Sequence, residues 1–142
     1  MLLSASAEYA VRAMIFLASR EPGKLAGARE ISQAEHIPMP FLWKILHMLT
    51  KRKLVRSFKG IRGGYELARP ADRISIGTIV SISDGNEFRE SCVLGLPECD
   101  HHHPCALHDQ WKGIRARVTG MLDETSLADL VRGSRARSRR RK

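Results

Sequence analysis

The residues of this chain that are best suited to chemistry are its cysteines and histidines, and most of them lie close together. All three cysteines and four of the six histidines fall within residues 92–108. Thiolate and imidazole ligands suit zinc or an iron–sulfur cluster, whereas carboxylate-rich sites suit magnesium or calcium. Gly95, Pro97 and Pro104 disfavour a continuous helix, so that the sulfurs can turn inward around one centre. The stretch therefore predicts a metal-binding loop.

The spacing of the candidate ligands leaves the identity of the metal open. Cys99 follows Cys92 by seven positions, Cys105 follows Cys99 by six, and His108 is three residues further on. Structural zinc sites usually pair ligands about two to four residues apart. Wider steps suit a cluster, in which the sulfurs bind different iron atoms. On spacing alone, a [2Fe–2S] or [4Fe–4S] cluster and a zinc ion are equally acceptable.

A metal-free role for the same cysteines is a further alternative. The neighbouring His101, His102 and His103 favour the thiolate form of a cysteine, which reacts directly with oxidants. Catalysis is not expected, because the chain has no Cys-x-x-Cys pair and no recognisable serine–histidine–aspartate or paired-carboxylate arrangement. The sequence therefore predicts a sensor and not an enzyme, with no small-molecule substrate.

Length and composition restrict the setting in which such a sensor works. A chain of 142 residues with 43% hydrophobic residues suits one compact domain with an appended element. No apolar run approaches the roughly 20 residues that cross a bilayer. The first eight residues lack the basic and apolar regions of a secretory signal. We therefore expect a cytoplasmic protein with no membrane partner, in which reducing conditions favour metal ligation over a structural disulfide.

Basic residues are concentrated in two parts of the chain. The net charge is +9 at pH 7, and residues 44–73 and 132–142 each contribute +7, so that the rest of the chain carries −5. Clustered positive charge is typical of surfaces that bind polyanions, most simply double-stranded DNA. Residues 132–142 contain seven basic side chains and no acidic one, a composition that predicts a disordered basic tail.

The elements before the cysteines form a pattern known from DNA-binding proteins. A helix over residues 4–19 precedes two helices, 28–35 and 40–53, which are joined by the turn His36-Ile37-Pro38. Two short helices joined so closely resemble a helix-turn-helix, although many helical hairpins share the pattern. Strands at 54–58 and 64–68, joined by a glycine-containing basic loop, add a hairpin. The fold class predicted is mainly α with a small β-hairpin wing, a winged helix-turn-helix.

Two sets of residues are candidates for DNA contact. The second helix of a helix-turn-helix enters the major groove, and a basic wing tip approaches phosphates or the minor groove. Trp43 could equally tuck against a neighbouring element, and each wing glycine could serve only the turn. The helix candidates are Pro40, Trp43, Lys44, His47 and Lys51, and the wing candidates are Ser57, Lys59, Gly60, Arg62, Gly63, Gly64 and Tyr65.

An amphipathic helix is expected over residues 107–124, after a shorter one over 78–83. Its apolar stripe exceeds what a monomer of this layout can easily cover, so we interpret it as the interface of a homodimer rather than as core. The stripe comprises Trp111, Ile114, Val118, Met121 and Leu122. A short capped turn over 125–131 follows. The predicted regions are a DNA-binding domain at 1–84, the cysteine loop at 85–108, a dimerisation region at 109–131 and the tail at 132–142.

Several motifs together resemble one family, the Rrf-two family of winged-helix transcriptional regulators, which includes the IscR, NsrR and RirA types. The resemblance covers residues 2–131. The motifs are Leu3-Ser4 with residues 8–13, Ile37-Pro38 before Phe41-Leu42, Leu54-Val55-Arg56-Ser57, the wing at 60–65, Ile74-Ser75-Ile76, and the cysteine triplet followed by Trp111.

The resemblance implies a homodimeric regulator, most simply a repressor, that binds palindromic operators and senses iron–sulfur status, nitric oxide or redox state. It implies that Cys92, Cys99 and Cys105 hold an iron–sulfur cluster, which favours the cluster over zinc. The fourth ligand implied is His108, as in the IscR type, or Glu8 of the partner subunit, as in one NsrR type. The chain departs from the IscR pattern at Trp43, where an acidic residue is frequent, and in its three consecutive histidines.

Overall fold

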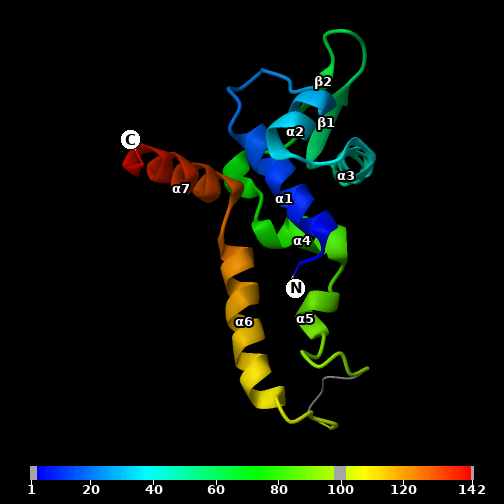
Figure 1. Ribbon diagram of the computed structural model, residues 1–142, viewed down its shortest axis with the longest axis vertical. Helices are drawn as coiled ribbons and strands as arrows, with labels where there is room; N and C mark the ends of the chain where they lie inside the picture. Colours follow the sequence, from blue (N-terminus) through cyan, green and yellow to red (C-terminus); the bar gives the residue numbers. More distant parts are fainter. Residues whose placement is uncertain (1–2, 98–101, 142) are drawn as a thin grey trace.

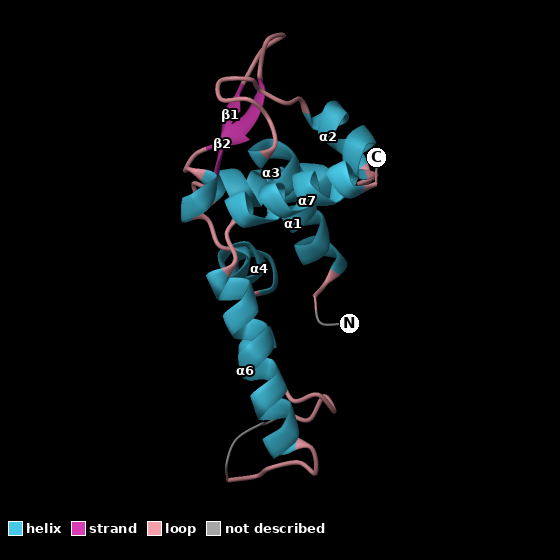
Figure 2. Cartoon of the chain, turned by 90° about the vertical axis from the view of Figure 1, so that its left-hand side faces the viewer, coloured by secondary structure: helices cyan, strands magenta, loops and turns pink. Residues whose placement is uncertain are grey.

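The computed structural model describes residues 3–97 and 102–141 (Figure 1). Two predicted loop residues, Cys99 and His101, lie outside that range. Most of the described chain is helical, and two strands form an antiparallel hairpin, as predicted (Figure 2). The helices are α1 (Ala5–Ala18), α2 (Ala28–Glu35), α3 (Met39–Lys51), α4 (Ile76–Asp84), α5 (Glu87–Glu90), α6 (His108–Glu124) and α7 (Leu127–Arg140); the strands are β1 (Val55–Phe58) and β2 (Gly64–Leu67), followed by a 3₁₀ turn, η1 (Ala71–Arg73).

The helix-turn-helix is formed by α2 and α3. His36 ends α2 in the left-handed conformation, with φ of 52°, and this reverses the chain within a few residues. The Ser32 hydroxyl donates a hydrogen bond of 2.6 Å to the Ile37 carbonyl and holds the turn closed. The helix α3 begins at Met39, one residue earlier than predicted, and Pro40 occupies its first turn, where proline is tolerated.

The core lies where α3 and α4 pack on α1, and α3 and α4 also contact each other. The residues 10, 13, 14 and 17 of α1 face inward at helical spacing. Full burial of a leucine or methionine side chain contributes about 1.5–3 kcal/mol, so these contacts account for much of the stability of this part of the chain. The fully or almost fully buried large side chains include Met14, Ile31, Ile37, Leu42, Leu46, Leu49, Leu54, Ile74, Ile79 and Leu127.

The wing is a hairpin of two four-residue strands, in which Val55 pairs with Leu67 and Phe58 pairs with Gly64. Tyr65 also exchanges backbone hydrogen bonds of 3.0 and 2.8 Å with Ala26, which ties the hairpin to the segment before α2. At Gly63 a Cβ atom would lie 2.1 Å from the Phe58 carbonyl oxygen, a distance that real Cβ contacts do not allow. Glycine is therefore required where the loop returns into β2.

The second half of the chain leaves the core and returns to it. The helix α4 is longer than the predicted 78–83, and the short helix α5 was not predicted from the sequence. The helix α6 extends away from the body, alongside α5 and the cysteine loop (Figures 1 and 2). No helix among the described residues is long and apolar enough to be a candidate for crossing a membrane.

The C-terminal segment differs from its prediction. The expected short turn at 125–131 and the expected disordered tail at 132–142 are wrong for residues 127–140, which form the helix α7. A capping box starts this helix: the Ser126 hydroxyl accepts from the Asp129 backbone, and the Asp129 carboxylate accepts from the Ser126 backbone. Buried Leu127 and Val131 anchor its first turns. Alanine and arginine are good helix formers, and basic residues suit the C-terminal end of a helix dipole, so the helix continues past the anchor.

Candidate metal centre and nucleic-acid interface

The cysteine loop joins α5 to α6 and brings two of the predicted ligands together. The Sγ atoms of Cys92 and Cys105 lie 3.6 Å apart, although the two residues are thirteen positions apart in sequence. The side chain of Cys92 is buried, and that of Cys105 is half-buried. The Leu94 backbone N–H donates to the Cys92 Sγ at 3.4 Å, a contact that favours a thiolate over a neutral thiol. The two sulfurs therefore face a common centre.

The other predicted ligands differ in where they lie. His108 is the first residue of α6, is 4% exposed, and donates its backbone N–H to the Cys105 carbonyl at 3.0 Å. Glu8 lies in the first turn of α1, and no hydrogen bond or ion pair joins it to the loop within the described part of the same chain. Cys99 lies outside the described residues. Over residues 3–97 and 102–141, no group of three or more histidine, cysteine or carboxylate side chains gathers at one point.

The residue before Cys92 is held by α6. The Ser91 carbonyl accepts a hydrogen bond of 2.9 Å from the Trp111 indole and one of 3.0 Å from the Arg115 guanidinium. Trp111 and Arg115 are four residues apart and therefore share one face of the helix. The sequence suggested Trp111 only as an interface residue and gave no indication of Arg115. We call these two hydrogen bonds to the Ser91 carbonyl the clamp. They make the position of Cys92 depend on the position of α6.

A second connection joins α5 to α6 and α4. The Arg89 guanidinium donates two hydrogen bonds, of 2.8 and 2.6 Å, to the Asp123 carboxylate. These hydrogen bonds hold the pKa of Asp123 below its usual value. The pair is partly exposed, so its contribution to stability is at most about 1 kcal/mol. Gly77 of α4 leaves room for it, since a Cβ there would lie 1.9 Å from an Asp123 oxygen.

An open cleft connects the cysteine loop with the beginning of α1. Its volume is about 620 Å³, and its lining includes Ser4, Asp84, Phe88, Cys92 and Trp111. The Ser4 backbone N–H donates to the Asp84 carboxylate at 3.0 Å, and this bond joins the N-terminal end of α1 to the end of α4. The loop, the entry to α6 and the first turn of the DNA-binding unit therefore adjoin one cavity.

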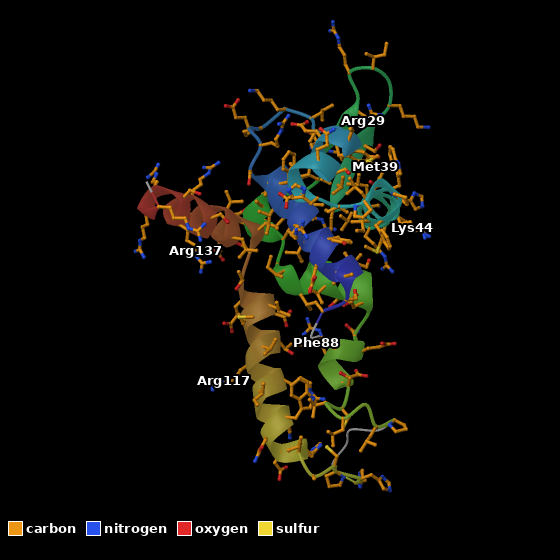
Figure 3. All side chains as sticks on the ribbon, viewed as in Figure 1. Arg29, Met39, Lys44, Phe88, Arg117 and Arg137 are labelled. Atoms are coloured by element: carbon orange, nitrogen blue, oxygen red, sulfur yellow. The ribbon has the colours of Figure 1, made fainter. Side chains whose placement is uncertain are left out.

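The predicted DNA-contacting residues lie on α3 and on the wing. The five helix candidates, from Pro40 to Lys51, are all exposed, and Trp43, at 53% exposed, leaves about half of its side chain open to a ligand. A groove between the two elements is lined by Trp43, Leu46, His47, Thr50, Ser57 and Tyr65. Lys44 points outward from α3 (Figure 3).

The wing candidates divide into tip and base. Lys59, Gly60 and Arg62 are exposed at the tip. Gly64 is buried, and a Cβ there would lie 2.8 Å from the Ala26 carbonyl oxygen, so this residue shapes the hairpin rather than its surface. Gly63 and Tyr65 are half-buried at the base. The surface offered to a ligand is therefore the outer face of α3 together with the basic tip.

Changing Lys59 and Arg62 to alanine is expected to weaken binding to all DNA sequences. The slope of log affinity against log salt should become shallower by about 0.9 for each phosphate that the variant no longer neutralises. Changing Trp43 or Lys44 is expected to alter the operator preferred, because the second helix of a helix-turn-helix contacts base edges in the major groove. Titrations of each variant against specific and random duplexes at several salt concentrations measure both effects. Equal weakening on all duplexes for both sets of variants would contradict the assignment of α3 and wing.

Comparison with known proteins identifies the family. The model of the Rrf2 family, described as iron-dependent transcriptional regulators, matches residues 3–133. The chain belongs to the Rrf2 (Rrf-two) family. Its winged-helix fold and its place among transcriptional regulators, both expected from the sequence, are thereby confirmed.

Individual Rrf2-family relatives agree over most of the chain. The chain is 42% identical over 135 residues to a protein of Mycobacterium tuberculosis named as an HTH-type transcriptional regulator, and the alignment covers 94% of this chain and 83% of that one. It is 30% identical over 131 residues to the transcriptional regulator IscR of Sodalis glossinidius, covering 92% and 79% of the two chains. The names of these relatives indicate a role in transcription rather than in catalysis.

Two solved Rrf2-type structures have the same fold. CymR, described as the global cysteine regulator of B. subtilis, superposes with a TM-score of 0.75 at 27% identity, covering 91% of this chain and 95% of that one. T. potens IscR superposes with a TM-score of 0.74 at 25% identity, covering 93% and 87%. The likeness extends beyond the winged helix, because more than nine-tenths of this chain is covered in each case.

Proposed function

We propose that this protein is a DNA-binding transcriptional repressor whose affinity for a palindromic operator is controlled by an iron–sulfur cluster bound in the loop of residues 92–108. The observation that carries the proposal is the convergence of the Cys92 and Cys105 sulfurs, 3.6 Å apart, at the foot of α6. Membership of a family described as iron-dependent regulators supports it.

The donor set fits an iron–sulfur cluster. Cysteine thiolates, usually four, are the protein ligands of such clusters, and a site of three thiolates with one position completed by imidazole or carboxylate is chemically acceptable. We assign Cys92, Cys99 and Cys105 as the thiolate ligands, with His108 or Glu8 of the partner subunit as the fourth. When bound, the cluster supplies a centre that gains or loses electrons and reacts with nitric oxide. Of the candidate ligands in the loop, Cys92 and His108 are buried, at 6% and 4% exposed.

The contacts around Ser91 provide a route from the loop to the rest of the molecule. Trp111 and Arg115 of α6 hold the Ser91 carbonyl, and Arg89 of α5 holds Asp123 near the other end of α6. A loop that orders around a ligand therefore fixes α6 relative to α5 and α4. Since α4 packs on α1, this change reaches the helix on which α3 rests.

The apolar stripe of α6 supports a homodimer. In the single chain Ile114 is 53% exposed and Met121 is 58% exposed, and Trp111, Val118 and Leu122 beside them are half-buried. Exposed apolar stripes of this kind mark association surfaces. A second copy of the chain that covers the stripe would place two α3 helices for two operator half-sites. A change in α6 then alters the spacing of the two DNA-binding units.

A metal-free thiol switch is the second candidate, and the same distance favours it. The two sulfurs need to approach by only about 1.5 Å to reach the disulfide length of about 2.05 Å. With hydrogen peroxide as oxidant, the two thiols would lose two protons and two electrons, and the peroxide would be reduced to two water molecules. A structural zinc ion at the cysteines is the remaining alternative.

Metal removal and oxidant treatment together distinguish the iron–sulfur cluster, the zinc ion and the metal-free thiol switch. Protein purified without oxygen is titrated with an operator selected from random duplexes, before and after treatment with nitric oxide or an iron chelator. The cluster proposal predicts a change in operator affinity of about 5- to 150-fold, the usual range of allosteric coupling. A change caused only by zinc chelation would favour zinc. A change caused only by peroxide in metal-free protein, and reversed by a thiol reductant, would favour the disulfide.

A further inference from the structure

The exposed part of α7 carries the densest positive charge in the described structure. Beyond buried Val131, the helix continues to Arg140, a length of about 13 Å for residues 132–140. No residue from 132 to 142 is acidic. Figure 1 shows this part projecting from the body on the side opposite α3, and Arg137 points away from the helix in Figure 3. We call residues 132–141 the basic arm.

The charges of the basic arm are largely uncompensated. Arg132 pairs with Asp129 of the same helix. Within the described ranges no ion pair involves the other arginines, which are Arg135, Arg137, Arg139, Arg140 and Arg141. Pairs such as 135 and 139, or 137 and 141, are four residues apart on the helix, where like charges repel. Binding of an anion relieves this repulsion, so a polyanion is the ligand whose charge complements the arm.

The base of the arm lies near two further basic residues of the body. The first turns of α7 pack on η1 and α1. Arg73 of η1 and Arg69 just before it are exposed, and neither forms an ion pair in the part of the chain that the structure describes. These residues follow directly after β2 of the wing. Two exposed arginines, with Asp72 between them, therefore lie in the chain between the wing and the elements on which α7 packs.

We infer that the basic arm of α7 is a second DNA-binding surface, which contacts the phosphates of duplex flanking the operator. A duplex held by α3 and the wing lies on the other side of the body from the arm. The arm therefore reaches phosphates only where the duplex continues past the operator and bends toward it. Arginine side chains on all sides of a helix fit phosphates without reading bases, so this contact adds affinity independently of sequence.

The test compares two duplexes that contain the same operator, and it rests on the proposed DNA-binding function. One duplex ends at the edges of the operator, and the other adds about 20 base pairs, two helical turns, on each side. The variant replaces the five uncompensated arginines with glutamine, which also favours helix, so α7 is retained. We expect the variant to bind the short duplex within about twofold of the parent and the long duplex at least about tenfold more weakly, with a shallower salt dependence.

A matched pair of single changes controls for net charge. Arg137→Gln in the arm and Arg117→Gln on α6 each remove one exposed positive charge (Figure 3). Only the first is expected to reduce the salt dependence on the long duplex. Equal affinity of the five-glutamine variant and the parent for the long duplex would overturn the inference. It would favour an acidic protein, rather than DNA, as the partner of the arm. Equal weakening on both duplexes would also overturn it. Failure of the parent to bind even the short duplex would instead contradict the proposed function.

Discussion

Replacing Cys105 with alanine is expected to remove iron and sulfide from the purified protein and to make operator affinity independent of nitric oxide. The reason is local: the Cys105 sulfur lies 3.6 Å from that of Cys92, so its removal leaves too few thiolates to hold a cluster. The measurement is the ratio of operator dissociation constants with and without nitric oxide. We expect this ratio to fall from about 5–150 in the parent to about 1 in the variant.

Leu96→Ala is the matched control for the cysteine change. Leu96 lies in the same loop, is 49% exposed and carries no ligand atom, so this variant should keep both the metal and the response. The Cys105 variant should also retain the melting temperature of metal-free parent protein, since a half-buried thiol contributes little to the core. A Cys105→Ala protein that still responds to nitric oxide like the parent would show that the loop is not the sensor.

Changing both Ile114 and Met121 to lysine is expected to convert the protein into a monomer. Both side chains are more than half exposed in the single chain, so the change should leave the fold intact while placing two charges in the proposed interface. A monomer binds two half-sites independently and loses the effective concentration of a linked pair, which is worth about 10²- to 10⁴-fold in affinity. Sedimentation equilibrium gives the mass, and operator titration gives the affinity.

A second lysine pair on the same helix controls for charge alone. Gly113→Lys with Ala116→Lys adds the same two charges away from the apolar stripe, at exposed positions of α6. This protein should remain a dimer with nearly unchanged operator affinity. If the Ile114 and Met121 variant stays dimeric, the stripe is not the subunit interface, and the route from the loop through α6 to the operator would need a different contact.

The DNA-binding unit could be predicted from the sequence because its signals are local. The turn at His36-Ile37-Pro38 and the glycines of the wing act over a few residues, and the predicted 28–35 helix agrees with α2 in the structure. The helix α5 was missed, since a four-residue helix is too short to show a hydrophobic period. It is held instead by the pairing of Arg89 with Asp123, a contact between residues distant in sequence.

The C-terminal helix shows how composition can mislead. Seven basic residues without an acidic one suggested disorder, yet the Ser126 and Asp129 capping box and buried Leu127 start a helix that the arginines extend. A high density of charge makes a segment costly to bury, but it does not prevent the segment from forming an exposed helix. Residues 132–140 of α7 are such an exposed helix. The packed first turns nucleate the helix, and each further residue then adds one backbone hydrogen bond.

For the candidate site, the approach of two of the cysteines could be predicted from the sequence, but the contacts that support them could not. The approach of Cys92 and Cys105 follows from residue type and a proline-interrupted loop, both visible in the sequence. The clamp on Ser91 involves a backbone carbonyl, which every residue possesses, so no sequence pattern indicates it. Trp111 was predicted to lie in the subunit interface because it belongs to an apolar stripe. That it also holds the Ser91 carbonyl is visible only in the structure, from the direction of its indole N–H.

The most direct test of the proposed function is the iron, acid-labile sulfide and zinc content of the unmodified protein purified without oxygen. The cluster proposal predicts iron and sulfide in equal amounts, with visible absorption whose shape tells a [2Fe–2S] from a [4Fe–4S] cluster. Stoichiometric zinc without sulfide, or protein free of metal that nevertheless binds its operator and responds to nitric oxide, would contradict it.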